Sequence, residues 1–157
     1  MTEAARQVLE DCRGALVDFK DGLQGGSWRR HYILCITLLR IVGHVLDNVD
    51  KLKDPVLKII IDDEYRKLKN SKKRHQIYWE FIDEERNDLL KEYKTSAGQG
   101  VTIKIGQKPA VEYHYVFNDG PFKERDQREV IQEAIVWWKS YLDNIDKRYE
   151  RGKSIKR

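Results

Sequence analysis

Apolar residues recur at helical spacing through most of the chain. Between about Thr2 and Asp21 they fall three and four positions apart, the spacing of one helix face. The same spacing predicts a second helix from about Trp28 to Asp50, with Ser27 as its N-cap. This second helix is apolar over most of its circumference, which is typical of a helix in the middle of a bundle.

Three further helices are predicted after it, and each carries a regular apolar face. The first of them opens on Asp54 as its N-cap, with Pro55 in the first turn, where a proline is well tolerated. The predicted extents of the three are about 54–68, 75–93 and 126–148.

In the helix at 75–93, Leu90 and Tyr93 are expected to face inward with Trp79, Ile82 and Leu89. In the last helix, Trp137 is expected at the edge of the apolar stripe, where it would cover the hairpin or a subunit interface.

Before the last of these helices the spacing changes from helical to alternating. In 101–105 and 111–117, β-branched and aromatic residues occupy every second position, which predicts a β-hairpin over about 101–117. The expected fold class is therefore mainly α, a bundle of four to five helices with a hairpin before the last long helix. A lone hairpin needs apolar support, so we expect Tyr113, Tyr115 and Phe117 to pack on a helix; stacking on nucleotide bases is the alternative.

The composition suits one domain, with 40% hydrophobic and 36% charged residues among 157. We predict a single helical domain over 1–148 and a basic C-terminal tail over 149–157. The longest mostly apolar run, Tyr32 to Leu39, is much shorter than the ~18 residues of a membrane span, and the N-terminal residues do not resemble a secretory signal. Cys12 and Cys35 are expected to be buried thiols, with a disulfide as the less favoured alternative, so a cytoplasmic protein without membrane association is predicted.

Positive charge is concentrated in two segments. Residues 65–75 contain six lysines and arginines and no acidic residue, and residues 147–157 contain six with one glutamate. The whole chain has a net charge of only +4, so the remainder is acidic. Such segments either hold phosphate groups or are solvated surface. The candidate nucleic-acid-binding residues are Lys69, Lys72, Lys73, Arg74, Lys147, Arg148, Arg151 and Lys153.

Common motifs for enzymes and metal sites are absent from the sequence. It has no glycine-rich phosphate loop, no HExxH, no CxxC pair and no GxSxG elbow. The four histidines fall on separate predicted elements, at positions 31, 44, 75 and 114. We therefore predict no metal and no cofactor.

Two arginines interrupt apolar helix faces. Arg40 lies one turn before His44 on the second predicted helix, and Arg86 falls on the face that carries the aromatic residues of the helix at 75–93. An unpaired buried charge is costly. Each arginine therefore either pairs with a carboxylate, such as Asp83 or Glu80, or lines a shared polar pocket.

The residues that follow Arg86 resemble a known signature. Arg86-Asn87-Asp88-Leu89-Leu90-Lys91-Glu92-Tyr93 is similar to the motif of the HEPN family, the helical-bundle domains of many RNases, toxins and defence proteins. The family pattern is an arginine, often followed by asparagine, then a histidine four to six residues on and sometimes a tyrosine two further. Here Arg86, Asn87 and Tyr93 fit that spacing, whereas Lys91 replaces the histidine.

The resemblance implies metal-independent RNA cleavage at a composite dimer site. It would place Arg86, Asn87, Lys91 and Tyr93 at the catalytic positions, with Arg40 and His44 as further members. A lysine can hold a phosphate but is a poor general base near neutral pH. We therefore expect a degenerate HEPN-like homodimer, a ribonuclease or defence-type relative that binds RNA or a partner without cutting. The alternative is a non-enzymatic protein–protein interaction or structural domain.

Overall fold

The computed structural model describes residues 1–154, within which the chain forms five α-helices and one two-stranded antiparallel sheet. The α-helices are α1 (Glu3–Asp18), α2 (Gly25–Asn48), α3 (Pro55–Asn70), α4 (Glu84–Glu92) and α5 (Gln127–Ser154). The linking turns are η1 (Asp50–Leu52), η2 (Lys72–His75) and the π-helical η3 (Ile77–Asp83), and the strands are β1 (Ala97–Lys104) and β2 (Ala110–Phe117). The predicted mainly α fold, with a hairpin before the last long helix, is confirmed.

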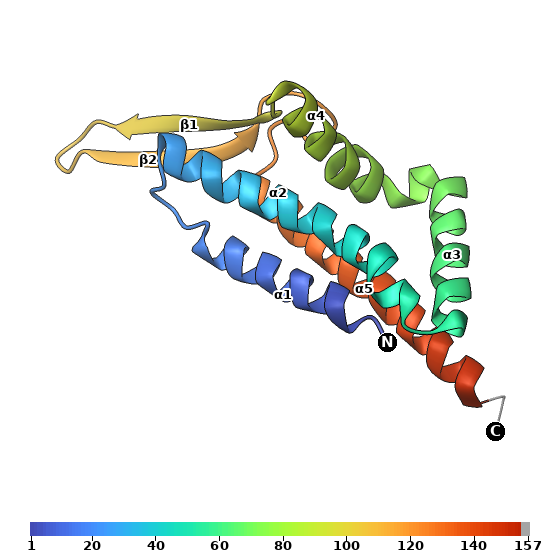
Figure 1. Cartoon of the computed structure of the whole chain (residues 1–157). Coiled ribbons are helices and arrows are strands. Elements are labelled where there is room, and N and C mark those ends of the chain that lie inside the picture. The colour runs from blue at the N-terminus through green and yellow to red at the C-terminus, as the bar shows by residue number, and fades with distance from the viewer. Residues whose placement is uncertain (155–157) are drawn as a thin grey trace.

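The bundle is elongated. Figure 1 shows α1, α2 and α5 running side by side, α3 turned across one end of them, and the hairpin projecting from the other end. The α2 helix packs on α1, α4, η3 and α5, so its predicted place in the middle of the bundle is confirmed. Its residues Tyr32, Cys35, Leu39 and Val42 are buried, while Leu34 on its second apolar stripe is half-exposed.

The helix termini show where the structure departs from local sequence signals. Asp54 caps α3 as predicted, since its side chain accepts from the backbone N–H of Val56 at 2.7 Å. Ser27 is not an N-cap, because α2 already begins at Gly25 and Gln24 stands at the cap position. The first two residues of α2 are Gly25 and Gly26, which have no side chains to indicate that the helix begins there.

The first turn of α1 is held by carboxylates from other elements. Asp50 is fully buried and accepts from the backbone N–H of Ala4 at 3.2 Å and of Ala5 at 2.8 Å. Asp146 on α5 accepts from the backbone N–H and the hydroxyl of Thr2, both at 2.9 Å. These carboxylates satisfy N–H groups that have no partner inside a helix, so they fix α1 to η1 and α5.

The hairpin is longer than predicted and only its base is packed. Strand β1 begins at Ala97, which pairs with Phe117, and the register runs to Lys104 opposite Ala110. The expectation that aromatic residues pack on helices is confirmed for Tyr115 and Phe117, which are buried. Further out, the apolar face of the hairpin is exposed, with more than half of the surface of Val101, Ile103 and Val111 open to solvent.

The predicted helix over 75–93 is divided by the π-helical η3. A π turn contains more residues than an α turn, so positions after it rotate away from the face that a regular 3.6-residue period predicts. Leu90 and Tyr93 were expected to face inward but are 65% and 68% exposed, whereas Glu85 and Leu89 are buried. Tyr93 also lies beyond α4, in the left-handed region with φ of 53°.

The last helix continues beyond its predicted end at Arg148. It reaches Ser154, so residues 149–154 of the predicted basic tail are helical, and 155–157 lie outside the described residues. Tyr149 is buried, and its hydroxyl donates to the Asp54 carboxylate at 2.7 Å. The end of α5 is thereby fixed beside the start of α3.

One segment, Gly25–Leu52, is long and apolar enough to cross a membrane when judged by length and composition alone. Arg40 interrupts its apolar residues, so the segment contains no uninterrupted apolar run of that length. The core helix of a soluble protein passes the same test, and α2 buries one side against α1 and α5.

Candidate functional site

The Arg40 side chain joins α2 to the segment that leads into α4. Its Nη2 lies 3.4 Å from Oδ1 of Asp83, and its Nη1 donates to the Tyr78 hydroxyl at 3.1 Å. The Nε atom is buried and has no hydrogen-bond partner among the described residues. Of the two interpretations of Arg40, the ion pair with Asp83 is therefore present, but it leaves one donor unsatisfied.

The start of the HEPN-like motif lies against the same carboxylate. The Asn87 amide donates to Oδ2 of Asp83 at 3.5 Å, and Arg86 donates from Nη1 to Oδ1 of Asn87 at 2.9 Å. Arg86 forms no ion pair within residues 1–154. Asp83 thus connects the α2 arginine to the Asn87 amide of the motif, although these residues are more than forty positions apart.

His44 lies close enough to Arg40 and Arg86 to interact with their charges. Partial burial lowers its pKa below the ordinary value, and the positive charges of Arg40 and then Arg86 lower it further. The imidazole is therefore favoured in its neutral form, in which one ring nitrogen can accept a hydrogen bond. The structure thus brings together four of the six candidate site residues, which we call the arginine cluster: Arg40, His44, Arg86 and Asn87.

The other two motif residues lie elsewhere. Lys91 is exposed in the last turn of α4, and in the described part of the chain neither its side chain nor that of Tyr93 forms a hydrogen bond or ion pair with the arginine cluster. Tyr93 instead contacts Arg29, whose guanidinium lies 4.7 Å from the ring centre and donates to the Tyr93 carbonyl at 3.1 Å. Within a single copy of the chain, the four motif residues therefore do not form one site.

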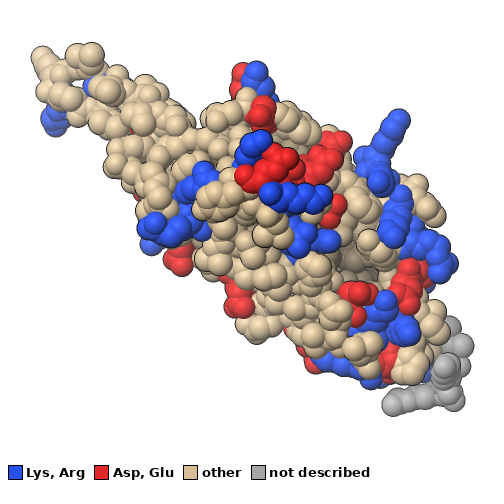
Figure 2. All heavy atoms as spheres, turned by 45° about the horizontal axis from the view of Figure 1, so that its top comes forward, with Lys and Arg blue, Asp and Glu red and all other residues tan. Residues whose placement is uncertain are grey.

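The surroundings of the motif are acidic. Burial raises the pKa of Glu84, and the neighbouring carboxylates of Glu80, Asp88 and Asp83 raise it further. Figure 2 shows acidic side chains in the middle of this face of the molecule, with lysine and arginine side chains among them. A phosphate group approaching Arg86 would therefore meet several negative charges on the same surface.

A second site lies between α3, η2 and the second half of α5. It is an open groove of about 810 Å³, which we call the basic groove. Figure 2 shows lysine and arginine side chains gathered at this end of the molecule. It is lined by Glu64, Lys67, Leu68, Ser71, Arg74, His75, Trp137, Ser140, Tyr141, Asn144, Arg148 and Arg151.

The basic groove contains residues from both predicted basic segments. Arg74 comes from the first, while Arg148 and Arg151 come from the second. The other candidates lie outside its lining. Among them, Lys69, Lys72 and Lys153 lie over the rings of Tyr65, Trp79 and Tyr149, at 4.6, 4.6 and 4.4 Å from the ring centres. Lys73 and Lys147 are exposed.

The charges of the basic groove differ in how far they are neutralised. Arg148 lies 2.8 Å from the Asp63 carboxylate and also pairs with Glu64. Lys67 pairs with the same two carboxylates, at 2.9 and 3.0 Å. Arg74 and Arg151 are exposed and form no ion pair within the described residues. These two arginines therefore provide the positive charge that is available to a ligand.

Aromatic and polar groups lie between the arginines. Trp137 stacks on Tyr141 with ring centres 5.1 Å apart, and its indole N–H donates to Nδ1 of His75 at 3.2 Å. Burial lowers the pKa of His75, and the charge of Arg74 lowers it further. A neutral His75 that accepts at Nδ1 carries its proton on Nε2, which leaves that atom as a donor.

Sequence reasoning did not identify Lys67, His75 and Trp137 as groove residues. Trp137 was expected at the edge of the α5 apolar stripe, covering the hairpin or a subunit interface, but it packs on Tyr78 and Tyr141 instead. Its position next to Trp138 was the available signal, because adjacent helical positions cannot both face one core.

Comparison of the chain with protein-family models, curated proteins and solved structures finds no match. Within residues 1–154, no group of three His, Cys, Asp or Glu side chains is placed to hold a metal ion. The chemistry available to the molecule therefore has to be inferred from the two sites themselves: an arginine cluster with acidic surroundings and a groove with two unpaired arginines.

Proposed function

We propose that the protein binds single-stranded RNA in the basic groove and does not cleave it. One observation carries the proposal: two basic segments more than seventy positions apart line the same groove, where Arg74 and Arg151 form no ion pair with any residue of 1–154. Phosphate contacts of this kind supply most of the affinity in sequence-independent binding, because they release counterions. The aromatic and amide groups between them suit contacts to sugars and bases.

The HEPN-like resemblance provides the reason for choosing RNA rather than DNA. It also bears on why cleavage is not proposed. Lys91 replaces the motif histidine and is exposed, away from Arg86, whereas Asp83, Glu84 and the neighbouring carboxylates make that surface unfavourable for phosphate. A degenerate HEPN-like domain, cytoplasmic and dimeric, which keeps RNA binding and has lost the base catalyst, fits these features.

Salt-dependent binding tests the proposal. Fluorescence anisotropy with a labelled twelve-nucleotide uridine RNA would be measured over a series of salt concentrations. For single strands, the slope of log affinity against log salt is about −0.7 for each phosphate neutralised. The double variant Arg74→Ala/Arg151→Ala should therefore bind more weakly, with a slope less steep by about 1.4.

The matched control is Lys20→Ala/Arg30→Ala, which removes the same charge from exposed positions away from the groove. We expect this control to retain nearly all of the binding. Equal losses in the two double variants, or no RNA binding by the wild-type protein at low salt, would refute the proposal. Cleavage of the RNA that disappears in Arg86→Ala would show instead that the HEPN-like motif is active.

A protein–protein interaction domain is the second candidate. The observation in its favour is the exposed apolar face of the hairpin, where Val101 lies opposite Tyr113 and Ile103 lies opposite Val111. Aspartate substitutions at Ile103 and Val111 would lower the molecular mass measured by light scattering if that face joins two copies.

A further inference from the structure

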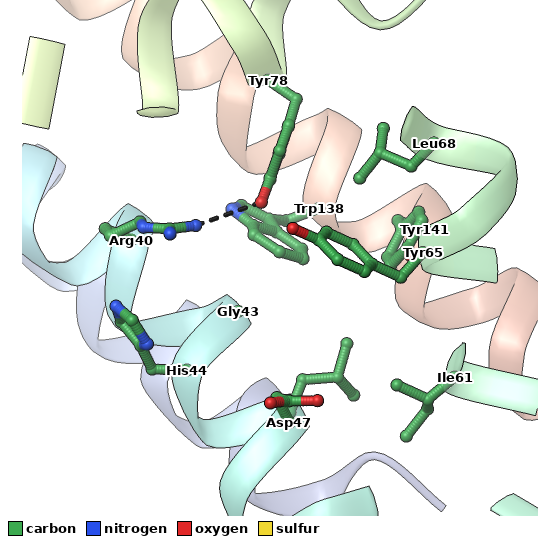
Figure 3. A pocket seen from close by; sticks show the side chains of 11 residues that line it. Arg40, Gly43, His44, Asp47, Ile61, Tyr65, Leu68, Tyr78, Trp138 and Tyr141 are labelled. Carbon is green, nitrogen blue, oxygen red and sulfur yellow. Dashed lines mark hydrogen bonds between the residues drawn. The ribbon is translucent and has the colours of Figure 1, made fainter. Parts of the chain in front are cut away.

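Outside the basic groove, the bonding groups that a partner can reach lie on the hairpin rather than in the interior. The hollow between α2, α3, η3 and α5 has a volume of about 240 Å³ (Figure 3). Two charged residues that line it are already paired, Arg40 with Asp83 and Asp47 with Lys51. The hairpin, by contrast, projects beyond the end of the bundle with much of its apolar face uncovered (Figure 1).

One edge of the hairpin has backbone groups without a partner. The N–H of Asn118 donates to the carbonyl of Ser96 at 2.8 Å, so these two residues form a hydrogen-bonded pair across the strands. Hydrogen-bonded and non-hydrogen-bonded pairs alternate along an antiparallel ladder, so the N–H and C=O groups of Gln99, Val101 and Ile103 point away from β2. Within residues 1–154, no backbone hydrogen bond from another segment reaches Val101 or Ile103.

The two edges of the hairpin differ in how they are protected. At its base, β2 is covered by the chain that follows, because Phe117 exchanges backbone hydrogen bonds with residues 124–125. Further out, β2 carries the charge of Glu112. In the described part of the chain β1 has no such cover, contains no proline or bulge, and bears one charge, Lys104, at its end. Uninterrupted edges of this kind are where sheets add further strands.

The apolar face beside that edge also lacks support. Val101 and Ile103 lie opposite Tyr113 and Val111 on one face, and Ile105, two positions further on, is 94% exposed. A two-stranded hairpin is marginally stable by itself, whereas three or more strands with an apolar face can be stable. Strands added at the β1 edge would turn the outer half of the hairpin into a sheet of that kind.

We infer that the β1 edges of two copies of the chain pair antiparallel about a two-fold axis and form a continuous four-stranded sheet. A second copy is favoured over an unrelated strand because the edge is complementary to itself. With the axis at Thr102, Val101 of each copy lies opposite Ile103 of the other, and Lys104 lies opposite Gly100. Cross-strand pairs of β-branched residues stabilise a sheet, and no like charges stand directly opposite.

Neighbouring registers of the two strands are less favourable. An axis between two residues would turn the apolar face of one copy to the polar side of the shared sheet. An axis at Ile103 would bring the two Lys104 side chains to diagonal positions about 7–8 Å apart. An axis at Val101 would place Ile103 opposite the polar Gln99. The register centred on Thr102 avoids all three.

The inference names the surface of the proposed dimer, and it rests on the proposed function in that respect alone. It uses no residue of the basic groove, which lies between α3 and α5 at the end of the bundle away from the hairpin (Figure 1). The interface involves a few residues of one strand in each copy, which is small for a stable complex. We therefore expect a dissociation constant of about 10 µM.

Cysteine cross-linking tests the register directly. Thr102 faces itself across the axis as a non-hydrogen-bonded pair, with Cα atoms about 4.5 Å apart, which is within the range of a disulfide. Thr102→Cys should therefore give a covalent dimer on mild oxidation. Glu112→Cys is the matched control, since it lies opposite Thr102 on the same exposed face but about 14 Å, three strand spacings, from its own copy. The native Cys12 and Cys35 are buried and should not contribute.

A charge at the axis tests the same contact without cross-linking. Sedimentation at concentrations from about 1 to about 200 µM measures the association. Thr102→Lys places two like charges opposite each other and should weaken the dimer about fivefold. His114→Lys is the matched control, because it adds the same charge and also removes the 2.7 Å hydrogen bond between Thr102 and His114, but lies on β2. It should dimerise nearly as the wild type does.

The outcomes distinguish this inference from the proposed function. A protein that stays monomeric at all these concentrations would overturn the inference. Equal cross-linking of the two cysteine variants, or equal weakening by the two lysine variants, would also overturn it, because the copies would then meet elsewhere. RNA binding by a monomeric protein would leave the basic groove as the RNA site. A dimer cross-linked through Thr102→Cys that binds no RNA would support the interface and refute the proposed RNA binding.

Discussion

Asp50 provides a quantitative test of how α1 is held to the bundle. The residue is fully buried, and its carboxylate accepts from the N–H groups of Ala4 and Ala5 and from the Lys53 ammonium, the last at 2.7 Å. In Asp50→Ala, the N–H of Ala5 stays buried without an acceptor, while the partly exposed Ala4 and Lys53 can turn to water.

The expected loss follows from these contacts. A buried donor left unsatisfied costs about 1–3 kcal/mol, and loss of a helix cap costs about 1 kcal/mol. We therefore expect Asp50→Ala to lower the free energy of unfolding by about 3 kcal/mol. For a chain of this length, that corresponds to a fall in Tm of roughly 10 °C. Asp50→Asn keeps one acceptor oxygen and should lie between the variant and the wild type.

Urea unfolding followed by circular dichroism and by tryptophan fluorescence measures the effect. The control is Asp11→Ala, an exposed position on the same helix that accepts only from the Gln7 side chain at 3.3 Å. It should change the free energy of unfolding by less than about 0.5 kcal/mol. The reasoning is refuted if Asp50→Ala costs no more than Asp11→Ala.

The remaining predictions concern other buried or perturbed groups. The pKa of His44 is lowered in the folded state. Its contribution to the free energy of unfolding should therefore be fully present above the unfolded pKa of about 6.5 and should be lost as the pH falls below it. His44→Gln should make this decline smaller, measured as urea midpoints between about pH 5 and 8. Burial raises the pKa of Cys35 to about 12 and also raises that of Cys12, so both thiols should react with an aromatic disulfide reagent only after unfolding. Glu85→Ala leaves the buried Tyr32 hydroxyl without its 2.8 Å acceptor and should lower the free energy of unfolding by about 2 kcal/mol, measured by urea titration.

Local sequence patterns were sufficient for the helices and the hairpin. A helix face depends on spacing within one segment, and the alternation over 111–117 correctly placed Tyr115 and Phe117 on the packed side. The π-helical η3 has no comparable signal. It breaks the period without a proline or glycine, and so the inward positions of Leu90 and Tyr93 were predicted wrongly.

The sites depend on contacts between distant segments. Arg74 and Arg151 were both recognised as basic candidates, but their meeting in one groove follows from the way α3 crosses the end of α5. Arg40 pairs with Asp83, one of the two carboxylates expected for it, because a partly buried arginine is stabilised by a carboxylate. Among residues 1–154 the indole N–H of Trp138 has no hydrogen-bond partner, and this could not be foreseen, since an apolar stripe does not reveal which polar atoms remain unsatisfied.

The link between Thr2 and Asp146 sets an order on the maturation of the chain during synthesis. The α1 and α2 helices are neighbours in sequence and can pair as soon as both have left the ribosome. Asp146, however, lies 144 positions after Thr2 and is therefore synthesised long after both helices. Until it emerges, the N–H and hydroxyl of Thr2 have no acceptor from α5. The contact that fixes the start of α1 to α5 can therefore form only after the α1–α2 pair is already in place.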